Sequence, residues 1–509
     1  LDAIVTVADA VHLSAQLGEH HEAEEQIAFA DVVLLNKTDL VDVNSLEGVE
    51  TRIRKINPYT KIIRTAHCEA PLENILGLDA FSLDRVLEVE PDFLDSDHDH
   101  EHDHDHDHEL LGCTDPEATN YNSVANVDDG SCVYGDIEGC MDMNALNYDQ
   151  YATIDDGSCI LVPSTYMFER DGMTSVSFGG QTCRLQMAKD IYDVMNTENG
   201  ASVPEFLNMF DNGQGFDFMY SCGKNIGSKT AASSSASSTV KSQFDDMFTV
   251  LVDEVYPNWT SNASTGVAGQ ITTSSGSTYQ VDGKGLEIDQ AFIKGLMGAM
   301  VVDQMTNNYL TPTKLDGDGT TNDVALIEAG DNYTDMEHYW DEGFGYLYGY
   351  NNEHVGGSDN NANGPAEGTG VLVNKYLKKL NDTSHPGIAN TIYDAFIMGR
   401  TAIIAQDYDL RDEQASIIKV NVDKIIAQKA YDYLSGGAAT IESGAPREDA
   451  FHGLSEGYGF VLSLQFTDLF SNGEVNSMLD QMMEGDGFWT ISADDLNSMA
   501  STIQMVAGL

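Results

Sequence analysis

The sequence has few basic residues and no long apolar run. Its 509 residues include 25 Lys and Arg against 83 Asp and Glu, which gives a formal net charge of -58. This balance argues against nucleic-acid binding, which needs basic side chains to displace the counterions of the phosphate backbone. It suits cation binding, high-salt surroundings or a solvated acidic surface instead. No stretch approaches the roughly 18 apolar residues of a transmembrane helix, so we expect no membrane span.

Cysteine is also scarce, and its distribution is uneven. Four of the seven cysteines lie in one short segment, a pattern typical of disulfides and of an oxidising compartment. The chain begins at Leu1 rather than Met, which we interpret as a fragment or a processed product. Its length predicts roughly three domains. From composition we divide it into four regions: 1–94, 95–110, 111–160 and 161–509.

The first region alternates short apolar stretches with amphipathic ones. The apolar stretches predict buried strands at 1–9, 31–35 and 60–64, and the amphipathic ones predict helices at 13–30 and 47–56. This alternation is typical of a parallel α/β sheet. Residues 1–94 are therefore predicted to form a partial sheet of this kind.

Asn36-Lys37-Thr38-Asp39 follows the second predicted strand directly and has the form N-K-x-D. In guanine-nucleotide proteins the Asp carboxylate accepts hydrogen bonds from the base, the Lys stem lies across it, and the Asn braces the loop. With LDAIVTVADA at 1–10, EQIAFADVVLLNKTDL at 25–40 and Ile56-Asn57-Pro58, the region resembles the CobW-type metallochaperone GTPases. That resemblance implies nucleotide-gated delivery of zinc or another metal such as cobalt, with Asn36, Lys37 and Asp39 contacting guanine.

The first region departs from this family in two motifs. It contains neither the phosphate-binding G-x-x-x-x-G-K-[ST] loop nor the Cys-x-Cys-Cys metal motif. Without the loop there is no visible triphosphate site, so we expect no GTP binding and no GTPase activity from residues 1–94. A truncated or degenerate remnant is the alternative interpretation.

The second region alternates histidine with Asp or Glu. Imidazole is a ligand for zinc, nickel and copper, and the alternating carboxylates add acceptors. We expect loose, multi-site binding that weakens below about pH 6, where histidine gains a proton. A solvated linker is the alternative. The predicted ligands are His98, His100, His102, His104, His106 and His108.

The third region is a tandem repeat with the pattern Gly-Cys…Asp-Asp-Gly-Ser-Cys, and the two cysteines of each repeat are 19 residues apart. The simplest connectivity is a disulfide within each repeat, Cys113–Cys132 and Cys140–Cys159, each stabilising by about 3 kcal/mol. The repeats resemble short tandem repeats of secreted bacterial proteins. Their Asp-Asp-Gly segments predict a turn, with a calcium site as the alternative.

The fourth region predicts a mostly α domain, a duplicated helical bundle, with helices at 184–197, 241–255, 285–305, 388–405, 411–434, 447–469 and 493–507. His338-Tyr-Trp-Asp-Glu342-Gly-Phe-Gly-Tyr346 and His452-Gly-Leu-Ser-Glu456-Gly-Tyr-Gly-Phe460 share the pattern H-x3-E-G-aromatic-G-aromatic. On a helix, residues i and i+4 share one face. Two such helices could converge on a metal site made by His338, Glu342, His452 and Glu456. Asp341, Arg400 and Asp407 are candidate supporting residues, and a metal-free buried His–Glu hydrogen bond is the alternative.

Residues 165–509 resemble domain of unknown function 4856, through the stretch 166–185, Lys294-Gly-Leu-Met-Gly-Ala-Met and the two H-x3-E segments. That family resembles the imelysin-like helical proteins of the bacterial envelope, which are linked to uptake of iron or other metals. Their motif is G-x-H-x-x-E, whereas this chain has one more residue between His and Glu. The resemblance implies metal capture without establishing the ligand geometry.

Three functions follow as expectations. The first is an envelope or secreted protein that captures divalent metal, zinc before iron, with metal ions and an uptake-system or cell-surface protein as partners. The second is a fragment of a nucleotide-dependent zinc or cobalt metallochaperone, and the third is a surface interaction module without metal chemistry. The sequence leaves open whether the chain is an enzyme, and the absence of enzymatic activity is the first expectation. Region 111–509 fits a periplasmic, cell-surface or secreted location, whereas 1–94 resembles cytosolic proteins, which suggests a chimeric or truncated chain.

Overall fold

The computed structural model describes the N-terminal sheet, much of the cysteine repeats and most of the helical region. The described residues are 4–10, 13, 26–28, 30–38, 41, 43–57, 60–66, 111–114, 121–129, 131–132, 136–217, 220, 222–317, 320–323, 332–350 and 364–509. Asp39 and the six predicted histidine ligands from His98 to His108 lie outside these residues. The chain folds into two compact units, Leu1–Gly112 with Val124–Asp128 and Cys113–Ser123 with Asp129–Leu509. The finer division into four regions stays a prediction.

A small parallel sheet forms the N-terminal unit, as predicted. Its strands β1 (Val5–Asp9), β2 (Val32–Asn36) and β3 (Lys61–Arg64) lie in that order, and helix α3 (Val43–Ile56) precedes β3. Alternate residues of β2, including Val33 and Leu35, share an apolar core with Val49 and Ile53 of the helix. Val32 and Leu34, which point to the other face of the strand, are buried as well. Burial of both faces explains why β2 is a continuous apolar run.

Asn57 ties the end of α3 to the segment before β2. Its Nδ2 donates to the carbonyl oxygens of Ile27 at 3.0 Å, Ala28 at 2.9 Å and Ala30 at 2.9 Å, and its Oδ1 accepts from the backbone N of Thr60 at 3.1 Å. One buried amide therefore satisfies several backbone groups of the two connections. This is the structural role of the Ile-Asn-Pro segment.

The cysteine repeats have little regular structure. Two-residue parallel pairs join β4 (Leu111–Gly112) to β5 (Val127–Asp128) and β6 (Glu138–Gly139) to β7 (Ile154–Asp155). The disulfides Cys113–Cys132 and Cys140–Cys159 are both present, which confirms the predicted connectivity. A unit of this size has too small a core to fold without such bonds.

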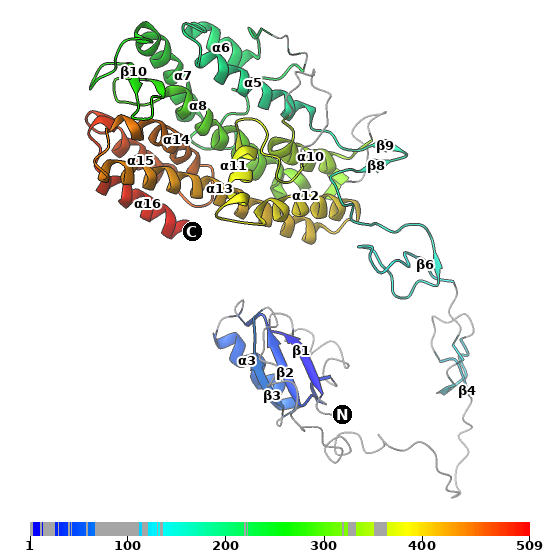
Figure 1. Cartoon of the computed structure of the whole chain (residues 1–509). Coiled ribbons are helices and arrows are strands. Elements are labelled where there is room, and N and C mark those ends of the chain that lie inside the picture. The colour runs from blue at the N-terminus through cyan, green and yellow to red at the C-terminus, as the bar shows by residue number, and fades with distance from the viewer. Residues whose placement is uncertain are drawn as a thin grey trace, which may run out of the picture. The chain divides into compact units, whose positions relative to one another are not determined.

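The C-terminal region is mostly helical, as predicted, and Figure 1 shows its helices gathered in one bundle. Its first half contains a hairpin β8–β9 and these helices in chain order: α5 (Gly179–Met195), α6 (Val203–Asn212), α7 (Ser237–Val250), α8 (Ile288–Leu296), α9 (Pro312–Asp316) and α10 (Asp335–Tyr348). π-Helical segments extend α7 over Leu251–Val255 and α8 over Met297–Val302 and Met305–Tyr309. The hairpin bounds are Glu169–Arg170 and Met173–Thr174.

The second half contains α11 (Val373–Asp382), α12 (Ile388–Ile404), α13 (Tyr408–Glu442), α14 (Glu448–Leu464), α15 (Asn472–Met482) and α16 (Ala493–Ala507). The 35-residue α13 packs against α12, α14 and α16, and α14 also packs against α8 (Figure 1). All seven predicted helices are therefore present. The sequence analysis missed a hairpin, β10 (Gly269–Thr272) with β11 (Thr278–Val281), between α7 and α8.

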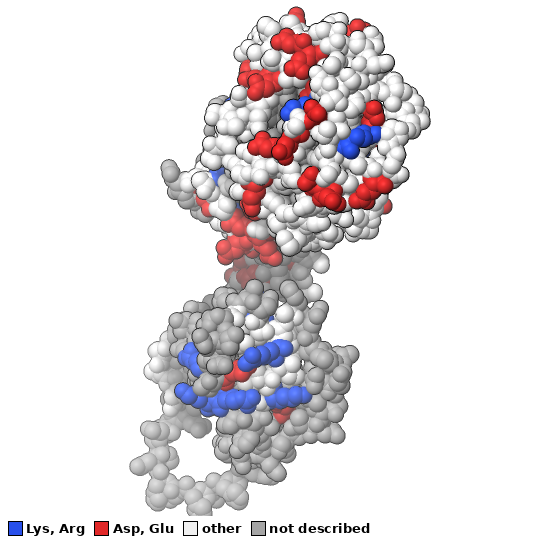
Figure 2. All heavy atoms as spheres, turned by 90° about the vertical axis from the view of Figure 1, so that its left-hand side faces the viewer, with Lys and Arg blue, Asp and Glu red and all other residues white. Residues whose placement is uncertain are grey.

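Charge on the helical region is mainly acidic. On the face drawn in Figure 2, Asp and Glu side chains are spread over the surface, and Lys and Arg appear in small patches. Among the described helices, none combines the length and the apolar character needed to cross a membrane.

Candidate functional site

Asn36 and Lys37 of the N-K-x-D segment lie at the carboxyl edge of the parallel sheet, where ligands bind in open α/β folds. Asn36 ends β2, and its Oδ1 accepts a hydrogen bond from the Thr65 hydroxyl at 3.2 Å. The backbone N and the hydroxyl of Thr38 both donate to the carbonyl oxygen of Thr65, at 3.2 and 3.1 Å. The loops after β2 and β3 therefore brace each other through Asn36, Thr38 and Thr65.

Lys37 pairs with a residue that the sequence analysis did not assign. Its Nζ lies 3.3 Å from Oδ2 of Asp9, the last residue of β1, and half of the Lys37 side chain is exposed. Lys37 also has a φ of 59°, which bends the chain sharply after the strand. Asp9 and Thr65 could have been found from sequence, since the carboxyl ends of adjacent parallel strands meet at one edge. The guanine assignment of Asn36, Lys37 and Asp39 stays a prediction.

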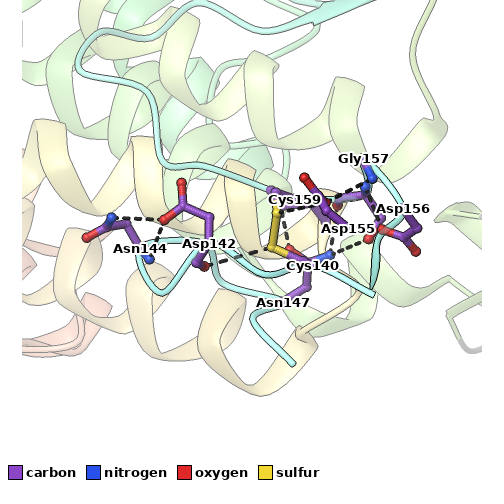
Figure 3. Close-up of a disulfide and its surroundings, with 10 residues drawn as sticks. Cys140, Asp142, Asn144, Asn147, Asp155, Asp156, Gly157 and Cys159 are labelled. Carbon is purple, nitrogen blue, oxygen red and sulfur yellow. Dashed lines mark hydrogen bonds between the residues drawn. A yellow bond between two sulfur atoms is a disulfide. The ribbon is translucent and has the colours of Figure 1, made fainter. Parts of the chain in front are cut away.

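The second cysteine repeat shows what its acidic residues do. Oδ1 of Asp142 accepts from the backbone N of Asn144 at 2.9 Å, and Oδ1 of Asp155 accepts from Gly157 N at 3.0 Å (Figure 3). Asp156 accepts in the same way from Ser158 N at 2.8 Å. These bonds to a residue two positions ahead are the turns that Asp and Asn favour.

The corresponding residues of the two repeats behave alike. Asp129 accepts from Ser131 N at 2.9 Å, as Asp156 does from Ser158. These hydrogen bonds from serine lower the pKa of both carboxyls. The contacts therefore fit the predicted turn, and calcium binding in the repeats stays a prediction.

A third disulfide, Cys183–Cys222, joins α5 to the segment before Lys224. The sequence analysis did not pair these two cysteines, because they belong to no repeat and stand 39 residues apart. Three disulfides between residues 113 and 222 are compatible with an extracellular or periplasmic protein.

The first H-x3-E pair lies on α10. His338 Nε2 and Glu342 Oε2 are 4.0 Å apart, and the His338 ring stacks on Tyr333 with ring centroids 5.0 Å apart. Glu342 Oε1 accepts from Nε2 of Gln181 on α5 at 2.7 Å. Gly345 allows close packing here, since a Cβ at this position would overlap the side chain of Phe178.

The second pair lies on α14 and has different partners. His452 Nδ1 lies 3.0 Å from Oε2 of Glu287, which precedes α8, and its ring stacks on Tyr279 of β11 with centroids 4.5 Å apart. Glu456 Oε1 lies 3.0 Å from Lys294 Nζ and accepts from the Tyr376 hydroxyl at 2.9 Å. The hydrogen-bond partner of His452 is thus Glu287 and not Glu456.

The four predicted ligands are divided between these two clusters. Within the described part of the chain, no three His, Cys, Asp or Glu side chains gather so as to hold a metal ion. The structure therefore brings together His338 with Glu342 and His452 with Glu287, and not all four side chains. A metal role for His338, Glu342, His452 and Glu456 stays a prediction.

Buried charge supports α10. The Arg400 guanidinium lies 2.8 Å from Glu337 and 3.2 Å from Asp341, and none of it is exposed. Burial raises the pKa of Asp341 to about 6, although the charge of Arg400 opposes this rise. Of the three supporting residues named from sequence, Asp341 and Arg400 bind each other, and Asp407 caps α13 by accepting from Leu410 N at 3.0 Å.

Buried charge also surrounds α14. Burial raises the pKa of Glu287 to about 7, although its hydrogen bond with His452 opposes the rise. Burial would also raise the pKa of Glu456, but the charge of Lys294 and hydrogen bonds from its neighbours bring it down to about 2. Clustered buried groups with pKa values pushed apart are common at functional sites, and they also occur in structural networks.

A cavity of about 820 Å³ lies elsewhere, between the end of α5 and α6. Asp190, Asp193, Glu205 and Asp217 line it together with apolar Phe216. It includes none of the predicted site residues. Its lining is strongly acidic, so it does not provide an obvious site for an anion.

Comparison with protein families matches two parts of the chain. Residues 163–509 match the model of the family described as domain of unknown function (DUF4856). Residues 1–64 match the CobW/HypB/UreG nucleotide-binding domain. Both resemblances noted from sequence are therefore confirmed, whereas that of the cysteine repeats to secreted repeats is not. No solved structure matches the chain.

Three curated relatives are similar to the N-terminal region of the chain. The zinc chaperone YjiA of Escherichia coli (strain K12) is 29% identical over 94 residues, 18% of this chain and 29% of that protein. The zinc-regulated GTPase metalloprotein activator 1 of Schizosaccharomyces pombe is 37% identical over 92 residues, 18% of this chain and 22% of the relative. The protein of the same name from Dictyostelium discoideum is 34% identical over 64 residues, 13% and 14% of the two chains. This chain thus spans less than a third of the length of these relatives.

Proposed function

The chain belongs to the family described as domain of unknown function 4856, and from that premise we propose that it handles divalent metal, with zinc as the first candidate cargo and iron as the second. One observation carries the proposal. The six-histidine segment His98–His108 directly follows a region similar to a zinc chaperone and to zinc-regulated GTPase metalloprotein activators. Imidazole is a common ligand of zinc, and alternating carboxylates provide further acceptors.

The helical region supports capture outside the cytoplasm. Its disulfide Cys183–Cys222 and the two repeat disulfides suit an oxidising compartment. Within this proposal the histidine segment collects metal loosely, and the helical region presents it to an uptake-system or cell-surface partner. The His452–Glu287 contact is the place where a more selective ligand pair would lie.

Calorimetry with Zn²⁺ on the oxidised full chain tests the proposal. Replacement of all six histidines from His98 to His108 by Asn should remove most zinc sites, and binding to the native chain should weaken below about pH 6, as the imidazoles gain protons. His452→Asn is the matched single substitution in the helical region: a loss of one site would place a ligand there. Unchanged zinc stoichiometry in the six-histidine variant would refute the proposal.

A second candidate is a piece of a nucleotide-dependent metallochaperone. The bracing of Asn36 by Thr65 and the pairing of Lys37 with Asp9 favour it, because both shape the strand ends where a base would lie. The same titration with GTP separates the two candidates. We expect no measurable GTP binding, since residues 1–94 contain no phosphate-binding loop, whereas tight binding would favour the second candidate.

A further inference from the structure

A lysine and a side-chain amide are buried together on α8. Gln290 and Lys294 stand four residues apart, so they share one face of the helix. Only 5% of Gln290 and 3% of Lys294 are exposed, although lysine is seldom buried this completely. Lys294 Nζ lies 2.5 Å from Gln290 Oε1. An amide C=O bond is about 1.23 Å long, which places Nζ within about 3.7 Å of Cδ, close to the ~3–3.5 Å from which atoms react.

Hydrogen bonds fix the orientation of the Gln290 amide. Its Nε2 donates to Asp289 Oδ2 at 2.6 Å and to the Tyr192 hydroxyl at 2.9 Å, while its Oε1 accepts from Lys294. The amide nitrogen therefore points toward an acidic side chain, and the carbonyl group points toward the amine. Burial raises the pKa of Asp289, although the charge of Lys294 opposes this rise. Asp289 is thus suited to pass a proton to the amide nitrogen.

A second carboxylate and two aromatic rings enclose the lysine. Glu456 Oε1 of α14 lies 3.0 Å from Lys294 Nζ. The ring centroids of Tyr192 and Tyr376 lie 5.8 and 6.0 Å from the same nitrogen. Burial disfavours the charged forms of lysine and glutamate alike, so a proton moves from Nζ to Glu456 at a lower cost than it would in water. The neutral amine formed in this way is the nucleophilic form of lysine.

We propose that Lys294 and Gln290 join through an isopeptide bond, a covalent amide between their side chains. Nζ gives one proton to Glu456 and attacks Cδ, so that the Nζ–Cδ bond forms. Nζ then loses a second proton, the leaving Nε2 gains a proton through Asp289, and the Cδ–Nε2 bond breaks to release ammonia. The ammonia takes the first proton back from Glu456 and departs as ammonium. Both carboxylates return to their initial state, and the reaction needs no oxidant and no cofactor.

Burial and spacing distinguish this pair from other lysine contacts of the chain. The fold holds the amine against the amide, which replaces a bimolecular collision by a contact within one molecule. The bond forms once per chain, so a slow reaction is sufficient. Lys378 and Asp382 have the same spacing on α11, but 43% of the Lys378 side chain is exposed, and we expect no bond there. The cross-link goes beyond the proposed metal handling, and its test uses the metal-free chain.

Tryptic digestion of the full chain, folded in the presence of EDTA, followed by mass spectrometry tests the bond. Trypsin cleaves after Lys and Arg, and the successive sites here are Lys284, Lys294 and Lys314. An unlinked chain gives the peptides 285–294 and 295–314. A linked chain gives one peptide, 285–314, that is lighter by the mass of one ammonia, because trypsin does not cleave after an acylated lysine. We expect the linked peptide, and recovery of the two separate peptides alone would overturn the proposal.

Matched variants test the role of Glu456 as the proton acceptor. The fraction of linked peptide at successive times after expression gives the rate of the reaction. Glu456→Gln should slow it about 100-fold or more, since a positioned proton acceptor contributes an effect of this size. Asp423→Asn should leave the rate unchanged, because Asp423 is also a buried carboxylate but accepts from Asp468 N. Equal rates in Glu456→Gln and the native chain would refute the role of Glu456.

A further substitution identifies the residue that loses ammonia. Gln290→Ala removes the amide carbon and should give the two separate peptides, while Lys294 and Glu456 remain in place. Circular dichroism checks that the variant keeps its helices. A peptide 285–314 lighter by one ammonia in this variant would assign the loss to another residue and overturn the proposal.

Discussion

Helices α10 and α14 carry the same nine-residue pattern, yet different charged side chains surround them. In both helices the His ring stacks on a tyrosine from a preceding segment, Tyr333 or Tyr279. In both helices a glycine of the pattern lets another element pack closely, beside Phe178 for Gly345 and beside Lys294 for Gly459. The shared positions therefore serve packing first.

The charge partners distinguish the two helices. Near α10, a fully buried Arg400 binds two carboxylates, Glu337 and Asp341. Near α14, Lys294 binds one carboxylate, Glu456, and a second carboxylate, Glu287, binds His452. A repeated sequence pattern can thus preserve helix packing while the electrostatics of its two copies diverge, which is why the pattern alone did not determine a ligand set.

The largest expected effect is a difference in stability between substitutions of Arg400 and Lys294. Arg400→Met should destabilise the protein by about 3–5 kcal/mol, because it leaves Asp341 fully buried without its cation, although Arg170 still binds Glu337. Lys294→Met should cost less, about 1–3 kcal/mol, since the Tyr376 hydroxyl still donates to Glu456. Denaturant unfolding followed by circular dichroism measures both.

Lys378→Met is the control for these substitutions. It breaks an exposed pair with Asp382 and should change the stability by about 0.5 kcal/mol or less. Equal losses for Arg400→Met and Lys294→Met would remove the electrostatic distinction between the two helices.

The second expected effect is a pH-dependent contribution of the His452–Glu287 pair to stability. Burial raises the pKa of Glu287 to about 7, so its contribution to stability is complete below about pH 4.5 and is lost as the pH rises through 7. Burial lowers the pKa of His452, but the hydrogen bond and charge of Glu287 outweigh this and raise it. Its contribution is therefore present below about pH 6.5 and also lost as the pH rises.

Both groups stabilise the fold less as the pH rises. The native chain should therefore lose stability with rising pH, compared with the Glu287→Gln variant at the same pH. The expected difference between about pH 5 and pH 8 is roughly 2–3 kcal/mol, since one pKa unit corresponds to about 1.4 kcal/mol. Melting temperatures of the two proteins across this range provide the measurement. Parallel curves would show that the pair does not titrate as the structure indicates.

The smallest effect concerns the glycines of α14. A Cβ at Gly459 would lie 2.5 Å from Lys294 Cβ and 2.9 Å from the backbone N of Gly295, so Gly459→Ala should cost about 1–2 kcal/mol. At Gly453 the nearest atom would be 3.9 Å away, and Gly453→Ala should stabilise the helix by up to about 1 kcal/mol. Denaturant midpoints compare the two substitutions directly. Equal effects would contradict the close packing of α14 on α8.

Local patterns predicted much of the architecture. The apolar run at 31–35 correctly predicted the second strand, β2. The spacing within each repeat predicted Cys113–Cys132 and Cys140–Cys159 correctly. These features depend on residues close together in the chain, and the hydrophobic period or a short loop is sufficient to determine them.

Long-range contacts were not accessible in this way. Nothing near His452 in the sequence identifies Glu287, which is 165 positions away, as its partner. In the same way, Cys183 and Cys222 belong to no repeat, and only the fold brings these two cysteines together.

By itself, the sequence determined the N-terminal parallel sheet, seven helices of the C-terminal region, the two repeat disulfides and the paired H-x3-E segments, because each is encoded by local spacing. Only the tertiary structure decided which charges meet: Arg400 with Glu337 and Asp341, Lys294 with Glu456, and His452 with Glu287. The physical reason is that burying a charge is costly without a partner, and the packing of whole helices selects that partner.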